Sequence, residues 1–307
     1  MAFIFANFGV RSESTFQVNY EVSSVMKLAV NYSTMLCTLL QQYPDLPIDF
    51  IKVPTRPFPG CWEQFNQGQE WRPLLPHLAQ PGVIALGHSD PEERFNETIV
   101  VKAIASGGAN YLSTHVEARV EYLPDFASAQ HQLEPLVYQK LSELFLQSIG
   151  EVQVKLPVPL VIENYPYYRW SNQYRWGSEP EFITDLCEST NCGFLLDIAH
   201  ARCTAWSNET KVEELTAGYP LNQLREIHLA GVQEREEGLR DTHTSLGEAD
   251  YDLLIKVLRK SEPEMISIEY GGLPEQIKKP DGTFEPIYRN SPEELLTMIE
   301  RIQTIIS

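Results

Sequence analysis

Imidazole and carboxylate side chains recur in this sequence at the ends of short apolar runs. Six successive runs close on one of them: His88, His115, Glu163, Asp197, His228 and Glu269. Histidine nitrogen and carboxylate oxygen are ligands that iron, manganese and zinc share, and no cysteine belongs to the pattern. The spacing therefore predicts metal binding without thiolate ligands.

Two short motifs enlarge this set. Asp197-x-x-His200 places a second ligand about one helical turn after Asp197, and Asp241-x-His243 places two ligands on the same side of an extended segment. The set then comprises His88, His115, Glu163, Asp197, His200, His228, Asp241, His243 and Glu269. One ion binds about six such groups, so the set predicts two or three metal ions with shared carboxylates. Each residue alone would be an ordinary hydrogen-bonded side chain, and only the joint pattern predicts a site.

The apolar runs that must position these residues have the character of buried parallel strands. They are short and rich in Val, Ile, Leu and Phe. We expect strands at Phe3–Asn7, Ile48–Val53, Val83–His88, Asn110–His115, Leu160–Glu163, Phe194–Asp197, Glu226–Leu229 and Met265–Tyr270. Helix starts with an early proline and acidic residues lie between them, at Pro91, Pro180 and Pro292.

Eight strands alternating with helices predict a (β/α)8 TIM barrel, in which the C-terminal strand ends converge on one mouth. Residues 1–307 carry no linker-like or repetitive stretch and are expected to form a single domain. An open, doubly wound sheet is the alternative, but no G-x-G-x-x-G motif follows an early strand.

Several segments between the expected strands receive their own predictions. The apolar stretch Val25–Leu40 contains Lys27 and Asn31, so it is expected to be a buried helix and not a membrane span. Residues 54–76 and 271–290 are expected to be long loops at the barrel mouth. His77 and His131 fall outside the ligand pattern and are expected at the surface.

Composition narrows the classes of function. The net charge of −18 is unfavourable for wrapping a nucleic acid, whose phosphates need Lys and Arg. Five cysteines without C-x-x-C spacing indicate reduced thiols, and the first residues lack the pattern of a signal peptide. We therefore expect a cytoplasmic protein that does not act on nucleic acid.

Three residues are expected to act beside the metals in catalysis. His200 is one, and Lys52 is a candidate anion or proton handle unless it pairs with an inner carboxylate. Asn164, directly after Glu163, could orient that carboxylate, contact substrate or cap the strand. The aromatic stretch from Tyr165 to Trp170 could line a pocket or pack against a neighbouring loop.

The second half of the sequence resembles a known family. The motifs are Leu160-Val-Ile-Glu-Asn164, Glu179-Pro-Glu-Phe182, Cys192-Gly-Phe-Leu-Leu-Asp197, Arg225-Glu-Ile-His-Leu-Ala-Gly231 and Asp241-Thr-His243. They resemble the multinuclear non-heme iron-dependent oxidases, formerly a domain of unknown function, within the xylose isomerase-like and endonuclease IV-like TIM barrels. The likeness extends over about residues 80–272. It implies that two histidines and four carboxylates bind metal, with His88 and His115 supplying the remaining ligands. The six are Glu163, Asp197, His228, Asp241, His243 and Glu269.

The resemblance also implies a chemistry. Members of that family bind two or three irons and use O2 to oxidise a cysteine, often in a small peptide delivered with a partner protein. A small thiol is a further candidate substrate, and zinc or manganese are further candidate metals. Two departures stand out: His200 replaces a common Asn, and the glycine-rich phrase after the first histidine is missing.

Other functions remain open at this stage. Asp197-x-x-His200, Asp241-x-His243 and the following Ser245-Leu-Gly-Glu248 also resemble endonuclease IV, in which the same ligand types hold three zinc ions that hydrolyse a phosphodiester. A sugar isomerase or epimerase would need fewer metals than the ligands allow. A binding protein without chemistry would show a coordination shell closed entirely by protein.

Overall fold

Eight parallel strands form a closed barrel in the order β1-β10-β7-β6-β5-β4-β3-β2. The computed structural model describes residues 26–54, 68–78, 83–106, 110–271, 275–279, 284–287 and 290–307. The barrel strands are β1 (Lys27–Asn31), β2 (Phe50–Pro54), β3 (Leu74–His77), β4 (Leu112–Val116), β5 (Leu160–Asn164), β6 (Gly193–Asp197), β7 (Leu224–Leu229) and β10 (Met265–Ile268). The predicted (β/α)8 architecture is confirmed.

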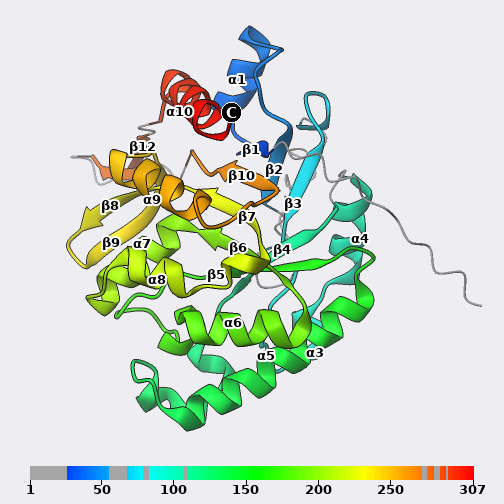
Figure 1. Ribbon diagram of the computed structural model, residues 1–307, viewed down its shortest axis with the longest axis vertical. Helices are drawn as coiled ribbons and strands as arrows, with labels where there is room; N and C mark the ends of the chain where they lie inside the picture. The colour runs from blue at the N-terminus through cyan, green and yellow to red at the C-terminus, as the bar shows by residue number, and fades with distance from the viewer. Residues whose placement is uncertain are drawn as a thin grey trace, which may run out of the picture.

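Helices surround the barrel and connect its strands (Figure 1). They are α1 (Thr34–Gln42), α3 (Pro91–Arg94), α4 (Glu97–Ser106), α5 (Pro135–Lys155), α6 (Pro180–Thr190), α7 (Ile198–Asn208), α8 (Val212–Gly218), α9 (Glu248–Leu258) and α10 (Pro292–Ile306). Short 3-10 turns lie at Val120–Tyr122, Pro124–Ala129, Arg175–Ser178 and Leu221–Gln223. The C-terminal helix α10 lies beside α1, next to the first strand (Figure 1). The three helix starts predicted from proline are confirmed.

Side chains inside the barrel are arranged in two layers. The lower layer is mainly apolar, and its buried members include Leu75, Val161 and Leu195. Successive side chains of a strand point to opposite faces, so residues two positions later again point inward, one step nearer the mouth. Those residues are polar: His77 follows Leu75, Glu163 follows Val161, and Asp197 follows Leu195. The apolar layer is thus a floor beneath a polar mouth.

The first barrel strand differs from the prediction. The predicted helix Val25–Leu40 is wrong at its start, because Lys27–Asn31 forms β1 and only the following residues form α1. Leu28, Ala29 and Val30 are completely buried between β10 and β2, and such a short apolar run does not distinguish strand from helix by its periodicity. The predicted strand Phe3–Asn7 lies outside the described residues.

The third barrel strand was also misplaced by the prediction. Residues 83–88 do not form a strand, apart from one bridge between Ile84 and Phe95. The third strand is β3, within the expected loop 54–76. Pro76 argued against a strand there, but β3 pairs with β4 only at His77 and Ser113, so a missing proline N–H disrupts little of the ladder.

Two hairpins follow the last barrel strands. β8 (Gly231–Arg235) and β9 (Gly238–Thr244) form an antiparallel pair after β7. β11 (Glu275–Lys278) and β12 (Phe284–Ile287) form another within the expected loop 271–290. The β8–β9 hairpin stands to one side of the barrel, against α7 (Figure 1). In the described part of the chain, no helix has the length and apolarity needed to cross a membrane.

A glycine holds the base of the β8–β9 hairpin. A Cβ at Gly231 would overlap the carbonyl oxygens of Thr244 and Ser245, whereas a Cβ at Gly150 in α5 would meet nothing within 4 Å. We expect Gly231→Ala to lower the free energy of unfolding by about 1–3 kcal/mol, because the hairpin must move away. The matched Gly150→Ala should leave it unchanged or raise it by about 1 kcal/mol. Denaturant unfolding measures both, and equal effects would contradict the crowding at Gly231.

Candidate metal centre

Glu163, at the mouth end of β5, lies fully buried among four histidines. Its Oε1 atom lies 3.3 Å from Nε2 of His115, 3.3 Å from Nδ1 of His200 and 3.5 Å from Nδ1 of His228. Its Oε2 atom lies 3.5 Å from Nε2 of His77. These histidines come from β4, α7, β7 and β3, so elements far apart in the sequence meet at one carboxylate.

Three further carboxylates face the same histidines. Asp197 Oδ2 lies 3.7 Å from Nε2 of His200 and 3.7 Å from Nδ1 of His228. Glu269 Oε1 lies 3.2 Å from that same Nδ1 atom of His228. Asp241 Oδ2 lies 3.5 Å from Nε2 of His200. The carboxylates thus surround the histidines from neighbouring strands and from the hairpin.

His243 on β9 lies at the exposed edge of this group of histidines and carboxylates. Its Nε2 atom lies 3.0 Å from Asp241 Oδ2 and 3.6 Å from Glu269 Oε2. The His243 side chain is 33% exposed, whereas those of Glu163 and His228 are at most 1% exposed. The His243 backbone adopts a left-handed φ of 49°, a conformation that is uncommon outside glycine. The side of the site at His243 is therefore accessible to solvent.

Several buried polar atoms of this group make no hydrogen bond with the described residues. They are both carboxylate oxygens of Glu163, Oδ2 of Asp197 and Nδ1 of His228. Buried polar groups in proteins are nearly always hydrogen-bonded, so atoms left over in one place need another partner. Two ligands of one ion, each about 2.1 Å from it, lie about 3.0–3.4 Å apart, close to the distances found here. These residues therefore fit metal ions.

The donor atoms form overlapping groups within which all atoms lie less than 4.8 Å apart. The groups are His77–Glu163–His228, His115–Glu163–His200 and Asp197–His228–Glu269. Glu163 belongs to two of them, as a carboxylate shared between neighbouring ions would. Nitrogen and oxygen donors of this kind suit iron, manganese or zinc.

Burial and neighbouring charges change the pKa values of several residues in the metal-free site. Burial, together with the charges of Asp241 and Glu163, raises the pKa of Asp197 to about 7. Burial alone would lower the pKa of His200, but Asp197, Asp241 and Glu163 raise it well above its usual range. Burial lowers the pKa of His77 well below its usual range. A bound cation would compensate the carboxylate charge that helps to raise the pKa values of Asp197 and His200.

Eight of the nine predicted ligands lie in this group, and His88 does not. The ring of His88 packs against Tyr122, and its Nδ1 atom accepts a hydrogen bond from the Asp90 N–H. The predicted strand end at His88 does not exist, so nothing directs this side chain to the mouth. His77, expected at the surface, is 7% exposed and takes the position at the end of β3. His131 is exposed, as predicted.

The other expected catalytic residues have defined partners. The Asn164 side-chain amide donates to the carbonyl of Asp197 and accepts from its N–H, so it holds the end of β6 against β5. Nδ1 of His200 donates to the Asn164 carbonyl, which leaves Nε2 facing the carboxylates. Lys52 is buried and pairs with Glu226 at 2.5 Å. A direct catalytic role for these residues stays a prediction.

Glu226 is a residue that the sequence reasoning missed. It is completely buried, and its Oε1 atom lies 3.1 Å from Nε2 of His228. The sequence contained the signal, because residues i and i+2 of a strand share a face. Placing His228 inside the barrel therefore also places Glu226 there.

Aromatic residues after β5 line the mouth beside the candidate ligands. The ring of Tyr165 lies 4.9 Å from that of His115. Tyr168 stacks on Trp170 at 4.7 Å, and the guanidinium of Arg240 lies 3.9 Å from the Trp170 ring. The Tyr168 hydroxyl accepts a hydrogen bond from the Asp241 N–H. We call Tyr165, Tyr168 and Trp170 the aromatic wall. It extends from Asp241 on the β8–β9 hairpin to a partly exposed surface.

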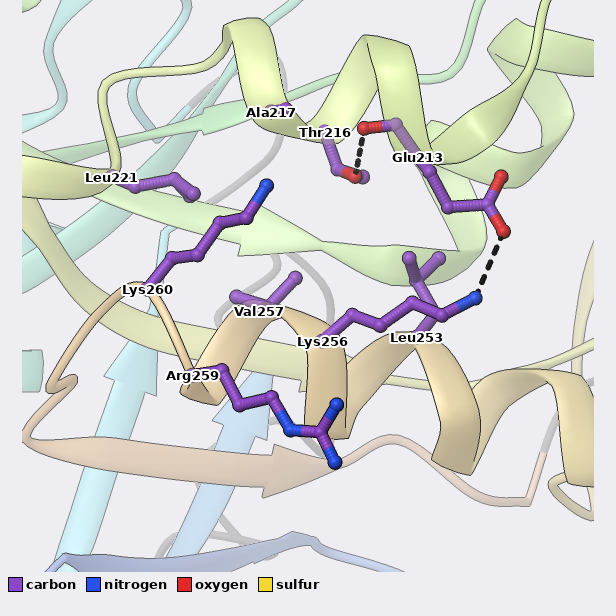
Figure 2. Close-up of a pocket in the computed structure, with 9 residues that line it drawn as sticks. All are labelled: Glu213, Thr216, Ala217, Leu221, Leu253, Lys256, Val257, Arg259 and Lys260. Carbon is purple, nitrogen blue, oxygen red and sulfur yellow. Dashed lines mark hydrogen bonds and ion pairs between the residues drawn. The ribbon is translucent and has the colours of Figure 1, made fainter.

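A separate pocket lies on the outer helical layer, between α8 and α9 (Figure 2). Figure 2 shows Lys256 and Lys260 extending from α9 and its C-terminal end towards α8, with Lys256 paired to Glu213 at 3.1 Å. None of its lining residues belongs to the histidine and carboxylate group. The candidate site is therefore at the barrel mouth and not in this pocket.

The fold and the gathered ligands define a TIM-barrel enzyme with a candidate metal centre at its mouth. The family model described as "RiPP precursor modification enzyme MbnB/TglH/ChrH" matches residues 38–276, more than half of the chain. The chain belongs to this family, whose enzymes modify precursors of ribosomally made peptides. The resemblance inferred from the motifs is thereby confirmed.

Curated relatives match over shorter stretches. A UPF0276 protein of Psychromonas ingrahamii is 31% identical over 121 residues, 38% of this chain and 42% of the relative. A UPF0276 protein of Paraburkholderia phytofirmans is 35% identical over 109 residues, 35% of each chain. The chain thus matches less than half of the length of these two relatives.

Solved structures resemble the chain in fold. A xylose isomerase domain protein from Alicyclobacillus acidocaldarius subsp. acidocaldarius has a TM-score of 0.56 at 13% identity, covering 92% of this chain and 98% of that one. A D-tagatose 3-epimerase-like protein has a TM-score of 0.55 at 13% identity, covering 91% and 98%. These similarities place the barrel among the xylose isomerase-like folds.

The raised pKa of Asp197 gives a prediction for the metal-free protein. Burial and neighbouring carboxylates raise that pKa from 3.8 to about 7, so the folded state keeps a proton that the unfolded chain has already lost. Asp197 alone should therefore lower the free energy of unfolding by about 2 kcal/mol as the pH rises from about 5.5 to 8, and His200, whose pKa is also raised, adds to that fall. Asp197→Asn should remove the Asp197 contribution, so its fall should be smaller than that of the wild type, and it should keep the cap on α7, because Asn also caps helices.

Denaturant unfolding of chelator-treated protein at both pH values measures this effect. Asp250→Asn is the control, since Asp250 is equally buried but bonds to Arg202 and the Gly247 N–H. The control should retain the pH dependence of the wild type. The same pH dependence in Asp197→Asn would contradict the prediction.

Proposed function

We propose that this protein is an oxidase that uses two or three bound metal ions, preferably iron, to oxidise a cysteine within a peptide. The observation that carries the proposal is the set of unpaired buried donor atoms around Glu163, which lie at distances suited to adjacent ions. Membership of a peptide-modifying family supports a peptide substrate. The motif resemblance described above supports iron, O2 and cysteine oxidation, with a partner protein as a candidate carrier of the peptide.

The chemistry needs both a protected interior and an accessible edge. The histidines and carboxylates described above would hold the iron. Bound iron would supply the electrons that activate O2. Glu163, Asp197 and His228 are buried and keep water from one side. His115 and His243 have side chains 19% and 33% exposed, so substrate would approach between them. A two-electron oxidation of the thiol balances reduction of O2 to hydrogen peroxide, and a four-electron oxidation balances reduction to two waters.

Zinc-dependent phosphodiester hydrolysis is the alternative that the ligand set also permits. His200 favours it, because this residue departs from the oxidase pattern and its Nε2 atom faces Asp197 and Asp241. The net charge of −18 opposes a nucleic-acid substrate. The metal that the protein retains separates the two functions, since iron can reduce O2 and zinc has no redox chemistry.

Metal content tests the proposed function. Protein purified without oxygen should contain two or three irons per chain and develop a visible charge-transfer band in air. Glu163→Gln should lose at least one of these ions, because the shared carboxylate is gone. The control Glu179→Gln, which removes a partly buried carboxylate paired with Arg175 at 2.7 Å, should retain them all. Colourless protein containing zinc would favour the hydrolase, and metal-free protein would refute both functions.

The aromatic wall predicts a role in substrate binding. Trp170 is 47% exposed beside the hairpin that carries Asp241, so a peptide entering the mouth would contact it. Trp170→Ala should raise the KM for a cysteine-containing peptide about three- to tenfold and change kcat by less than about twofold. Tyr43→Ala, at an equally exposed aromatic residue at the end of α1, should change neither. Steady-state kinetics, followed by mass spectrometry, measures KM and kcat for both variants. An unchanged KM in Trp170→Ala would show that the aromatic wall does not bind the substrate.

A further inference from the structure

A buried polar group lies directly beneath the candidate metal centre. It comprises Lys52 on β2, Tyr111 before β4, Glu226 on β7 and Ser267 on β10, each at most 1% exposed. We call these four residues the Glu226 cluster, because every member contacts that carboxylate. Lys52 Nζ and Ser267 Oγ each lie 2.5 Å from Glu226 Oε1, and the Tyr111 hydroxyl donates to Oε2 at 2.9 Å.

The Glu226 cluster reaches the metal centre through His228. Glu226 Oε1 lies 3.1 Å from Nε2 of His228, on the side of the ring opposite the candidate metals. Nδ1 of His228 faces Glu269, Glu163 and Asp197 at 3.2, 3.5 and 3.7 Å and makes no hydrogen bond with the described residues. One ring nitrogen therefore contacts the cluster and the other is free for a metal.

The two neighbours of Nε2 favour opposite forms of the ring. A neutral imidazole carries its proton on one nitrogen and a lone pair on the other. Glu226 can only accept, so it favours a proton on Nε2 and a lone pair on Nδ1. Lys52 also contacts Nε2, and its ammonium can only donate, which favours the proton on Nδ1. A metal on Nδ1 would require the ring proton on Nε2, where Glu226 is the acceptor that this proton needs, and the ammonium then donates to Glu226.

We infer that Glu226 is a positioning residue that fixes His228 with the Nδ1 lone pair towards the metal, while Lys52, Tyr111 and Ser267 hold Glu226 in place. The inference rests on the proposed function, since it takes His228 as a metal ligand. Carboxylates that accept from the second nitrogen of a metal-binding histidine generally contribute 10- to 100-fold to metal affinity. Lys52 acts here through Glu226 and not on the substrate.

Two double variants separate positioning from a structural role. Single substitutions leave a buried charge without its partner, which can prevent folding. Lys52→Met with Glu226→Gln, and Lys52→Met with Glu226→Met, both remove the buried ion pair and conserve side-chain volume. Only the glutamine can still accept a hydrogen bond from Nε2 of His228. The two variants therefore differ in that acceptor and match in charge.

Binding of Fe2+ and Co2+ by the full chain provides the readout. Metal retained against a competing chelator gives the affinity, and the visible spectrum of bound Co2+ reports the ligand geometry. We expect the glutamine variant to bind within about threefold of the wild type, and the methionine variant about 10- to 100-fold more weakly with an altered spectrum. Asp250→Asn, which removes a buried carboxylate with no contact to the centre, should bind as the wild type does.

The outcomes distinguish this inference from the proposed function. If the wild type binds metal and the two double variants bind it equally, Glu226 is merely structural and the inference is wrong. If the wild type binds neither ion, the proposed function fails together with it. Thermal unfolding of both metal-free double variants should give similar melting temperatures, so that a difference in affinity reflects the acceptor and not stability.

Discussion

Four carboxylates gathered at one barrel mouth are the constraint on which the rest of the structure depends. Glu163, Asp197, Asp241 and Glu269 lie within a few ångströms of shared histidine nitrogens, mostly away from water. Burying negative charges together is unfavourable unless cations compensate them. Protonated histidines can do so in part, as the shifted pKa values indicate, but the unpaired buried atoms remain. Metal ions would both neutralise the carboxylate charge and coordinate the unpaired atoms. The electrostatics of the site therefore favour the same ions that its chemistry needs.

The barrel meets this constraint by separating an apolar floor from a polar mouth. Alternation along β3, β5 and β6 places an apolar side chain such as Val161 or Leu195 one step below a ligand, so the same strands supply core packing and donor atoms. The Glu226 cluster reaches into the lower layer, where Lys52 aligns with Leu75 and Glu226 with Leu195. The β8–β9 hairpin brings Asp241 and His243 over the open side, and Gly231 allows its close approach. The position of two candidate ligands, Asp241 and His243, thus depends on the lack of a side chain at Gly231.

Much of this arrangement was predictable because strand ends in a barrel converge whatever their separation in sequence. Glu163 and His228 could be placed from short apolar runs alone, and the barrel fold was predicted from the number of those runs. The errors share a cause, since short apolar segments do not reveal whether they are strands. The strand at Leu74–His77 contains a proline, and its pairing with β4 could not be foreseen, so His88 was chosen in place of His77. The pairing of Lys52 with an inner carboxylate was predicted and is confirmed, but the identity of that carboxylate, Glu226, depends on tertiary packing.

Diffraction at the iron absorption edge, from crystals grown without oxygen, tests the central claim most directly. The account predicts two or three anomalous peaks at the barrel mouth, at least one about 2.0–2.2 Å from an oxygen of Glu163 and neighbouring peaks about 3.5–4 Å apart. A single peak remote from Glu163, or a map without peaks in which protonated histidines pair with every carboxylate, would contradict it.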